Sequence, residues 1–301
     1  MSKFVLQPED GSVQNGNLRG DDSVDLQVAR SVNTQVASGY ASFIMGGLGN
    51  TASGNYTGAF GANNTSAGTG AITFGVGNQA IGNYSLSAGL NSQSLGQGST
   101  SIGYESIANG LSSSIAFSYS SVTDATAPFS TIIGGSDANT YLYGQTTSAG
   151  GKFATAGDAQ ASSLMVRRAI TSASAGDPAY ELYPNGVNTT FVLVPKGNNR
   201  AWSCVLDTIA VCTAQGGSPQ LTIGDIYSIK QSFFIKKVGG VLTVSSLDTI
   251  AEESDTHMST SLVNVTVVGA VYIAITFSVP TTALTSNFRV VSKLDFTEVA
   301  W

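Results

Sequence analysis

The sequence predicts an all-β protein with an N-terminal parallel β-roll of fourteen-residue coils, followed by an antiparallel β-sandwich. Three observations lead to this prediction. Glycine recurs at a constant interval in the first half, and short alternating apolar segments separated by turn residues fill the second half. Charged residues make up only 11% of the 301 residues, against about 25% in an average globular protein. Such a chain must obtain its solubility from hydroxyl and amide side chains.

Glycine occupies every seventh position from 47 to 110. The surrounding residues repeat every fourteen positions, as in NYTGAFGANNTSAG and NYSLSAGLNSQSLG, so one coil contains two seven-residue units. We expect two short strands and two tight turns per coil, with glycine allowing positive φ or close backbone approach at the corners. The glycines that define the repeat are Gly47, Gly54, Gly61, Gly68, Gly75, Gly82, Gly89, Gly96, Gly103 and Gly110.

The residue before each repeat glycine is usually apolar or small, and we expect it to fill the interior of the coil. These residues are Phe60, Ala67, Phe74, Ile81, Ala88, Leu95 and Ile102. One roll with so thin a core predicts self-association, in which other apolar residues pack the rolls around a common axis. Candidates for these contacts are Tyr56, Ile72, Tyr84 and Leu86.

Two other repeat structures do not fit this pattern. A coiled coil also has a seven-residue period, but a glycine in every heptad would cost about 1 kcal/mol each in a helix. Collagen needs glycine at every third position, which this sequence lacks. The period therefore favours the β-roll.

The repeat stops around Asp124, and we place a neck at residues 124–158 and a sandwich of eight or so strands, with a jelly roll as one topology, at 159–301. Cys204 and Cys212 are eight residues apart, so on one continuous strand they share a face and cannot bridge each other. We expect two reduced, packed thiols, with a disulfide across a hairpin as the alternative.

Composition excludes several classes of function. The net charge of −6 and the scarcity of Lys and Arg leave no basic stripe for nucleic acid. The longest apolar run is shorter than the roughly 20 residues of a membrane span, so we expect no membrane insertion. The first residues lack an apolar run of signal-peptide length, which predicts a protein kept in a cytoplasm until release. With two Cys and the single His257, we expect no zinc site and no cofactor.

The fourteen-residue pattern closely resembles the head repeats of trimeric autotransporter adhesins, whose heads are left-handed parallel β-rolls that work as trimers. We expect this protein, unlike those adhesins, to have no signal peptide, coiled-coil stalk or membrane anchor. RGDDSVDLQVARSVNTQVASG before the repeats and SAGGKFATAGDAQASSLMVRRA after them resemble bacteriophage and prophage virion proteins, in which the same roll lies between a short N-terminal motif and a C-terminal β domain.

These resemblances imply a trimeric bacteriophage fibre that attaches the virion to the host cell surface without catalysis. Residues 1–30 would bind another virion protein, through Arg19, Gly20, Asp21 and Asp25. The β-roll at 31–123 would form the shaft, and the sandwich would bind a host glycan or protein. Its candidate contact residues are Tyr180, Tyr183, Trp202 and Trp301, because exposed aromatic side chains are favoured at such contacts; each is also compatible with a half-buried place in the sandwich core.

Several alternatives stay open at this point. A capsid decoration or head fibre would need the same repeat and the same trimer. A polysaccharide depolymerase would need paired carboxylates, and Asp124, Asp137, Asp177 and Glu181 are available to meet across a subunit boundary. His257 lies near Glu252, Glu253 and Asp255, where a polar loop between strands accounts for the residues better than a metal cluster.

Overall fold

The computed structural model describes residues 11–12, 16–171, 179–187, 193–216, 221–259, 261–279 and 285–301. The chain divides into two compact units. The first, which we call the solenoid unit, comprises Met1–Tyr141 and Ser148–Ala156. The second, the antiparallel unit, comprises Leu142–Thr147 and Gly157–Trp301. Both units are built of β-strands, which confirms the all-β prediction.

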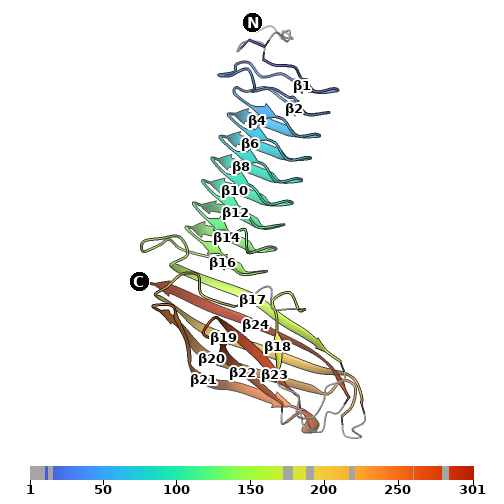
Figure 1. Cartoon of the computed structure of the whole chain (residues 1–301), viewed down its shortest axis with the longest axis vertical. Helices are drawn as coiled ribbons and strands as arrows, with labels where there is room; N and C mark the ends of the chain where they lie inside the picture. Colours follow the sequence, from blue (N-terminus) through green and yellow to red (C-terminus); the bar gives the residue numbers. More distant parts are fainter. Residues whose placement is uncertain are drawn as a thin grey trace. The chain divides into compact units, whose positions relative to one another are not determined.

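The solenoid unit contains two parallel sheets that follow one another around each coil (Figure 1). From β4 onward each coil contributes one longer strand and one shorter strand, joined by tight turns, as the repeat predicts. The first sheet begins with the two-residue strands β1 (Val24–Asp25) and β2 (Phe43–Ile44) and continues with the longer strands β4 (Gly58–Ala62), β6 (Ile72–Val76), β8 (Leu86–Leu90), β10 (Thr100–Tyr104), β12 (Ser114–Tyr119) and β14 (Thr131–Ser136). The shorter strands are β3 (Thr51–Ala52), β5 (Thr65–Ser66), β7 (Gln79–Ala80), β9 (Gln93–Ser94), β11 (Ile107–Ala108), β13 (Val122–Thr123) and β15 (Asn139–Thr140).

The repeat glycines are required because successive coils approach closely at the turns. Gly75 has a φ of 111°, and a Cβ atom there would lie 2.1 Å from the carbonyl oxygen of Gly89 in the next coil. At Gly68 φ is not positive, but a Cβ would lie 2.1 Å from the carbonyl oxygen of Gly82. A side chain at these positions therefore collides with backbone, which explains why glycine recurs without interruption.

The interior of the coils is lined by small and polar residues, so the expectation that the residue before each glycine fills it is wrong. Phe60 and Ile102 are half-buried, and Phe74 is exposed. The strand period of two explains the difference, since the neighbours of these residues point inward instead. The inward residues of the longer strands are Ala59, Thr73, Ser87 and Ser101, and those of the shorter strands are Ser66, Ala80, Ser94 and Ala108, all fully buried.

Many of the buried polar side chains are hydrogen-bonded within the coils, whereas the buried hydroxyls of Ser85 and Ser99 have no partner among the described residues. Asn50, Asn64 and Asn78 stand one above another, and the Oδ1 atom of each accepts the backbone N–H of its successor in the column. The hydroxyl of Ser66 bonds the hydroxyl of Thr73 at 2.8 Å. Buried polar groups of this kind stabilise a fold only when they are paired, and the repeat pairs the asparagine column and Ser66 in this way.

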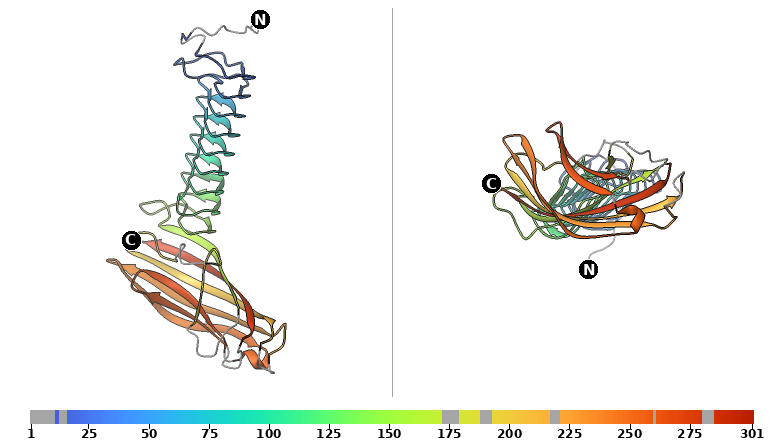
Figure 2. Two further views of the ribbon diagram at one scale, coloured as in Figure 1. Left: turned by 45° about the vertical axis from the view of Figure 1, so that its right-hand side comes forward. Right: turned by 90° about the horizontal axis from the view of Figure 1, so that it is seen from below.

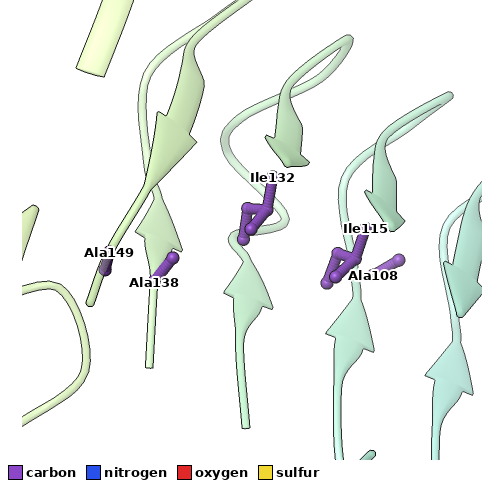
Figure 3. Close-up of a cluster of buried hydrophobic side chains, with 5 residues drawn as sticks. All are labelled: Ala108, Ile115, Ile132, Ala138 and Ala149. Atoms are coloured by element: carbon purple, nitrogen blue, oxygen red, sulfur yellow. The ribbon is translucent and has the colours of Figure 1, made fainter. Parts of the chain in front are cut away.

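Farther along the solenoid the interior gains large apolar residues beside its polar ones, and the coils continue past Thr123. Ile115 and Ile132 are fully buried and cluster with Ala108, Ala138 and Ala149 (Figure 3). Ser114 pairs with Thr131, seventeen residues later, in place of the fourteen that separate Thr100 from Ser114. Residues inserted in the turn around Pro128 therefore end the sequence period without ending the coils, so part of the predicted neck belongs to the solenoid unit.

The antiparallel unit contains a five-stranded and a three-stranded antiparallel sheet (Figure 2). The larger sheet has the order β17 (Ala159–Ile170), β24 (Asn287–Ala300), β19 (Arg200–Ala214), β20 (Ile226–Val238) and β21 (Val241–Ser254). The smaller has the order β18 (Tyr180–Leu182), β23 (Tyr272–Ser278) and β22 (Leu262–Val268). The short strand β16 (Thr146–Ser148) and the 3₁₀ helix η1 (Thr256–Met258) are the other elements that the structure describes between Tyr141 and the C-terminus.

Alternate residues of the longest strands are buried, as expected for strands with one face on a core. The ring centroids of Tyr227 on β20 and Phe277 on β23 are 6.1 Å apart, and Phe277 lies 6.3 Å from Phe288 on β24, so the two sheets share this core. Cys204 and Cys212 are both buried and free on β19, which confirms that one strand carries both thiols. Burial raises the pKa of the Cys204 thiol.

Candidate interaction surfaces

The outer side of the longer solenoid strands carries apolar residues, among them Phe60 and Phe74, which sequence reasoning assigned to the interior. Phe60 stacks on Phe74 with ring centroids 4.6 Å apart, and Tyr104 stacks on Tyr119 at 5.0 Å. We call the exposed members of this column, whose exposed fractions run from 37% to 82%, the apolar face. They are Met45, Phe74, Val76, Leu90, Tyr104, Phe117, Tyr119 and Ile133.

A second set of aromatic residues lies at one turn of the coils. Tyr56 and Tyr84 both have positive φ, 58° and 57°, and both are largely exposed. Tyr56 makes an edge-to-face contact with Tyr40 at 5.4 Å between ring centroids. Ile72 and Leu86, also expected at a self-association surface, lie half-buried at the start of β6 and β8.

The residues expected to attach the N-terminus to a virion lie within the first coils of the solenoid. The carboxylate of Asp25 is fully buried, 2.8 Å from the guanidinium of Arg30 and 3.6 Å from that of Arg19. Gly20 lies against the backbone of Gly39, where a Cβ would meet a carbonyl oxygen at 2.3 Å. The buried Asp25 carboxylate therefore serves the fold, and Gly20 is required where the two backbones approach closely. Asp21 is exposed, whereas the Arg19 side chain is only 14% exposed. Residues 1–10 and 13–15 lie outside the described residues.

In the antiparallel unit, three strands bring a charged and aromatic cluster together. Arg168 of β17 lies over the rings of Tyr180 and Tyr183, at 5.3 and 5.7 Å from their centroids, and its Nη1 donates to the backbone carbonyl oxygen of Glu181 at 3.1 Å. The hydroxyl of Tyr272 on β23 donates to Oε2 of Glu181 at 3.3 Å. We call these five residues the Glu181 cluster.

The carboxyl group of Glu181 is partly removed from water. This burial raises its pKa, while hydrogen bonds from Tyr272 and Tyr183 and the positive charge of Arg168 act in the opposite direction. Burial also raises the pKa of Tyr183, and the nearby Glu181 carboxylate adds to this shift. All five side chains are half-buried, so the cluster combines desolvated polar groups with a surface that a ligand can reach.

Sequence reasoning identified Tyr180 and Tyr183 but missed Arg168 and Tyr272. A signal for Arg168 does exist, because it shares the period-two register of Leu164, Val166 and Ile170, all of which are buried. A charged residue on the apolar side of a strand is unusual and marks a possible site. Tyr272 lies within an apolar run and has no comparable signal.

Of the two tryptophans expected at a receptor contact, one is buried in the structure. Trp202 is 0% exposed and stacks on Phe296 with ring centroids 4.4 Å apart, so it belongs to the core. Trp301 is 62% exposed, with the ammonium group of Lys236 at 5.9 Å from its ring centroid. Trp301 therefore keeps the surface position that a contact requires.

The carboxylates considered for catalysis are engaged in separate local interactions. Asp124 accepts hydrogen bonds from Thr126, and Asp137 lies 2.7 Å from the ammonium group of Lys152. Asp177 lies outside the described residues. The His257 Nδ1 atom is 3.8 Å from the carboxylate of Asp225. Among the described residues, no group of three or more His, Cys, Asp or Glu side chains is arranged to hold a metal ion, and no helix has the length and apolar character of a membrane span.

No protein-family model and no curated protein sequence matches the chain. Three similar solved structures are phage tailspike proteins. That of Acinetobacter baumannii phage AM24 has 8% identity, a TM-score of 0.29, and coverage of 91% of this chain and 56% of its own. That of Acinetobacter phage vB_ApiP_P1 has 10% identity, a TM-score of 0.23, and coverage of 92% and 54%. The third, gp49 of Acinetobacter baumannii bacteriophage Fri1, is a capsular polysaccharide depolymerase with 8% identity, a TM-score of 0.24, and coverage of 98% and 70%.

These comparisons correct one expectation. The chain was expected not to be an enzyme, and the similarity to gp49, a capsular polysaccharide depolymerase, contradicts that expectation, which we do not retain. The chain spans 56% and 54% of the lengths of the first two tailspike structures. At TM-scores of 0.23 to 0.29 the similarity establishes neither a common fold nor a substrate for this chain.

Proposed function

We propose that this chain is a virion-associated bacteriophage protein of the fibre or tailspike type. In this proposal the solenoid unit associates as a homotrimer and forms a shaft, residues 1–30 contact another virion protein, and the antiparallel unit binds a molecule of the host cell surface. The repeat and flanking sequences that resemble phage virion proteins support this assignment. The observation that carries it is the inverted distribution of residues in the solenoid, with polar side chains inside and the apolar face outside.

The size of the apolar face fits an interface between protein chains. If a large apolar side chain presents about 200 Å² when fully exposed, the eight exposed residues leave on the order of 800 Å² uncovered. Stable interfaces bury about 800 Å² on each partner, and a contiguous patch of this size is unusual on a monomer. The face is therefore large enough to hold copies of the solenoid together.

The charge distribution favours a second copy of the chain as the partner. Between Ser31 and Thr123 the only charged residue is Glu105. A neutral face can meet a copy of itself without repulsion between like charges, whereas a charged face would need a complementary partner. Three copies would also present three antiparallel units, so weak individual contacts with a cell surface would add up.

Cryo-electron microscopy of the intact phage particle tests this function. The proposal expects density for three copies at the tail, with the solenoid toward the particle and the antiparallel unit outermost. Density at symmetry sites of the capsid would replace host attachment with a decoration role. A particle without this chain would contradict the virion assignment itself.

A further inference from the structure

The Glu181 cluster assembles hydrogen-bonding groups of opposite kinds within one half-buried site. The Glu181 carboxylate accepts, the phenol groups of Tyr183 and Tyr272 both donate and accept, and the Arg168 guanidinium donates. The Arg168 guanidinium donates to the carbonyl oxygen of Glu181 and also to the hydroxyl group of Tyr183. The site is formed by residues from β17, β18, β23 and the turn after β18, so its geometry depends on the folded sheets and not on one flexible loop.

The chemistry of these groups fits a polyhydroxyl ligand. Neighbouring hydroxyls of a sugar can donate to a carboxylate and accept from a guanidinium or a phenol, and the apolar side of the sugar ring can pack on a tyrosine ring. The charges of Arg168 and Glu181 cancel, so the site as a whole does not select for a charged ligand. Partial burial strengthens each of these hydrogen bonds relative to bonds made in water.

We propose that the Glu181 cluster binds a neutral saccharide. This inference rests on the proposed attachment function and names the ligand class of the antiparallel unit. Glu181 accepts hydrogen bonds from two adjacent sugar hydroxyls, Tyr183 and Tyr272 orient the carboxylate and contact the same hydroxyls, and Tyr180 and Tyr183 provide the ring surface. Arg168 holds the two tyrosine rings in place through its contacts with their faces.

Binding of defined polysaccharides by the full-length chain tests this inference. The neutral probes are dextran, mannan and galactan, and the acidic probes are polygalacturonate and polysialic acid, each titrated by isothermal titration calorimetry. We expect at least one neutral polymer to bind and the acidic polymers to bind at least tenfold more weakly. Glu181→Gln should weaken neutral binding about tenfold or more, since hydrogen bonds to charged groups are the strong ones. Tyr183→Phe and Tyr272→Phe should each weaken it several-fold.

Matched substitutions outside the cluster provide the controls. Glu253→Gln makes the same chemical change at an exposed position of β21, and Tyr84→Phe removes an exposed phenol from the solenoid; both should bind like the unsubstituted chain. Circular dichroism shows whether each variant is folded, and the two phenylalanine variants serve if Glu181→Gln does not fold. Failure of every neutral polymer, preference for the acidic polymers, or unchanged affinity in the cluster variants would overturn the inference. A trimeric, tail-located chain with any of these results would leave the proposed function standing.

Discussion

The side chain of Asn64 links its own coil of the solenoid to the next coil, where it bonds the backbone of Asn78. Its Oδ1 accepts the backbone N–H of Asn78 at 2.9 Å, and its Nδ2 donates to the carbonyl oxygens of Phe60 and Gly75, both at 2.8 Å. Asn78 repeats this arrangement with Ser92, Phe74 and Gly89. The asparagine side chains thus bond carbonyl oxygens of the longer strands in their own coil and in the next one, and so tie successive coils together through a polar interior.

Substitution of Asn78 should therefore destabilise the solenoid. Asn78→Ala leaves the buried N–H of Ser92 without its Oδ1 partner, and an unpaired buried group costs about 1–3 kcal/mol. The substitution also removes the hydrogen bonds from Nδ2 to the carbonyl oxygens of Phe74 and Gly89. We expect the free energy of unfolding to fall by about 2 kcal/mol or more in urea denaturation followed by circular dichroism at one protein concentration. Gln97→Ala, at an exposed position, is the control and should change it by less than about 0.5 kcal/mol. Equal effects of the two substitutions would show that the asparagine column does not stabilise the coils.

The repeat glycines should be intolerant of even a methyl group. In Gly75→Ala the new Cβ would lie 2.1 Å from the carbonyl oxygen of Gly89, at a φ of 111° that alanine rarely adopts. We expect a loss of more than about 2 kcal/mol or a chain that does not fold, measured in the same way. Gly150→Ala has open space around its Cβ and no positive φ, and should be close to neutral. A stable Gly75→Ala protein would contradict the close approach of neighbouring coils.

The two tryptophans should differ sharply in their effect on stability. Trp202→Ala removes a buried side chain that packs on Phe296, and such substitutions cost about 3–5 kcal/mol. Trp301→Ala removes an exposed ring and should cost less than about 1 kcal/mol. Thermal unfolding monitored by tryptophan-independent far-ultraviolet circular dichroism distinguishes the two. Similar losses for both would place Trp202 outside the core.

The raised pKa of Glu181 predicts how binding and stability depend on pH. Its folded-state pKa lies above the ordinary value because of burial, so its contribution to stability is present in full below the ordinary glutamate pKa and is lost as pH rises through the folded pKa. Saccharide binding should show the opposite trend, falling as acid protonates the carboxylate that faces Arg168, Tyr183 and Tyr272. Glu181→Gln should remove the pH dependence of binding across pH 4–7 and should not lower stability at pH 7. Binding by the unsubstituted chain that is constant across this range would contradict the role of the carboxylate.

The sequence predicted the coils well because glycine spacing reports directly on where two backbones meet, as at Gly75 and Gly89. It did not show which side of a strand faces inward, since Thr73 and Phe74 alternate and ordinary hydrophobic reasoning chooses Phe74 for the core. That choice assumes that one chain contains its own core. The glycine period also placed the end of the coils near Thr123, which is too early. An insertion around Pro128 interrupts the sequence period there, while the strand pairing continues from Ser114 to Thr131.

The sequence identified only part of the Glu181 cluster, for a different reason. Tyr180, Glu181 and Tyr183 are neighbours in the chain. Tyr272 lies near them only because β18 pairs with β23, and no local sequence pattern predicts this pairing. Asp25 illustrates the converse. The resemblance of the N-terminal segment to phage virion proteins implied a contact with another protein, but Arg19 and Arg30 enclose the Asp25 carboxylate within the first coils.

The central claim, that the outward apolar residues of the solenoid are an interface between copies, is tested most directly by the mass of the full-length chain in solution. Size-exclusion chromatography with multi-angle light scattering should give three times the mass of the 30.8 kDa chain. Ile133→Ser, within the apolar face, should lower that mass or its stability to dilution, while Ile223→Ser, equally exposed in the antiparallel unit, should not. A folded protein of 30.8 kDa, with its apolar face open to water, would contradict the account.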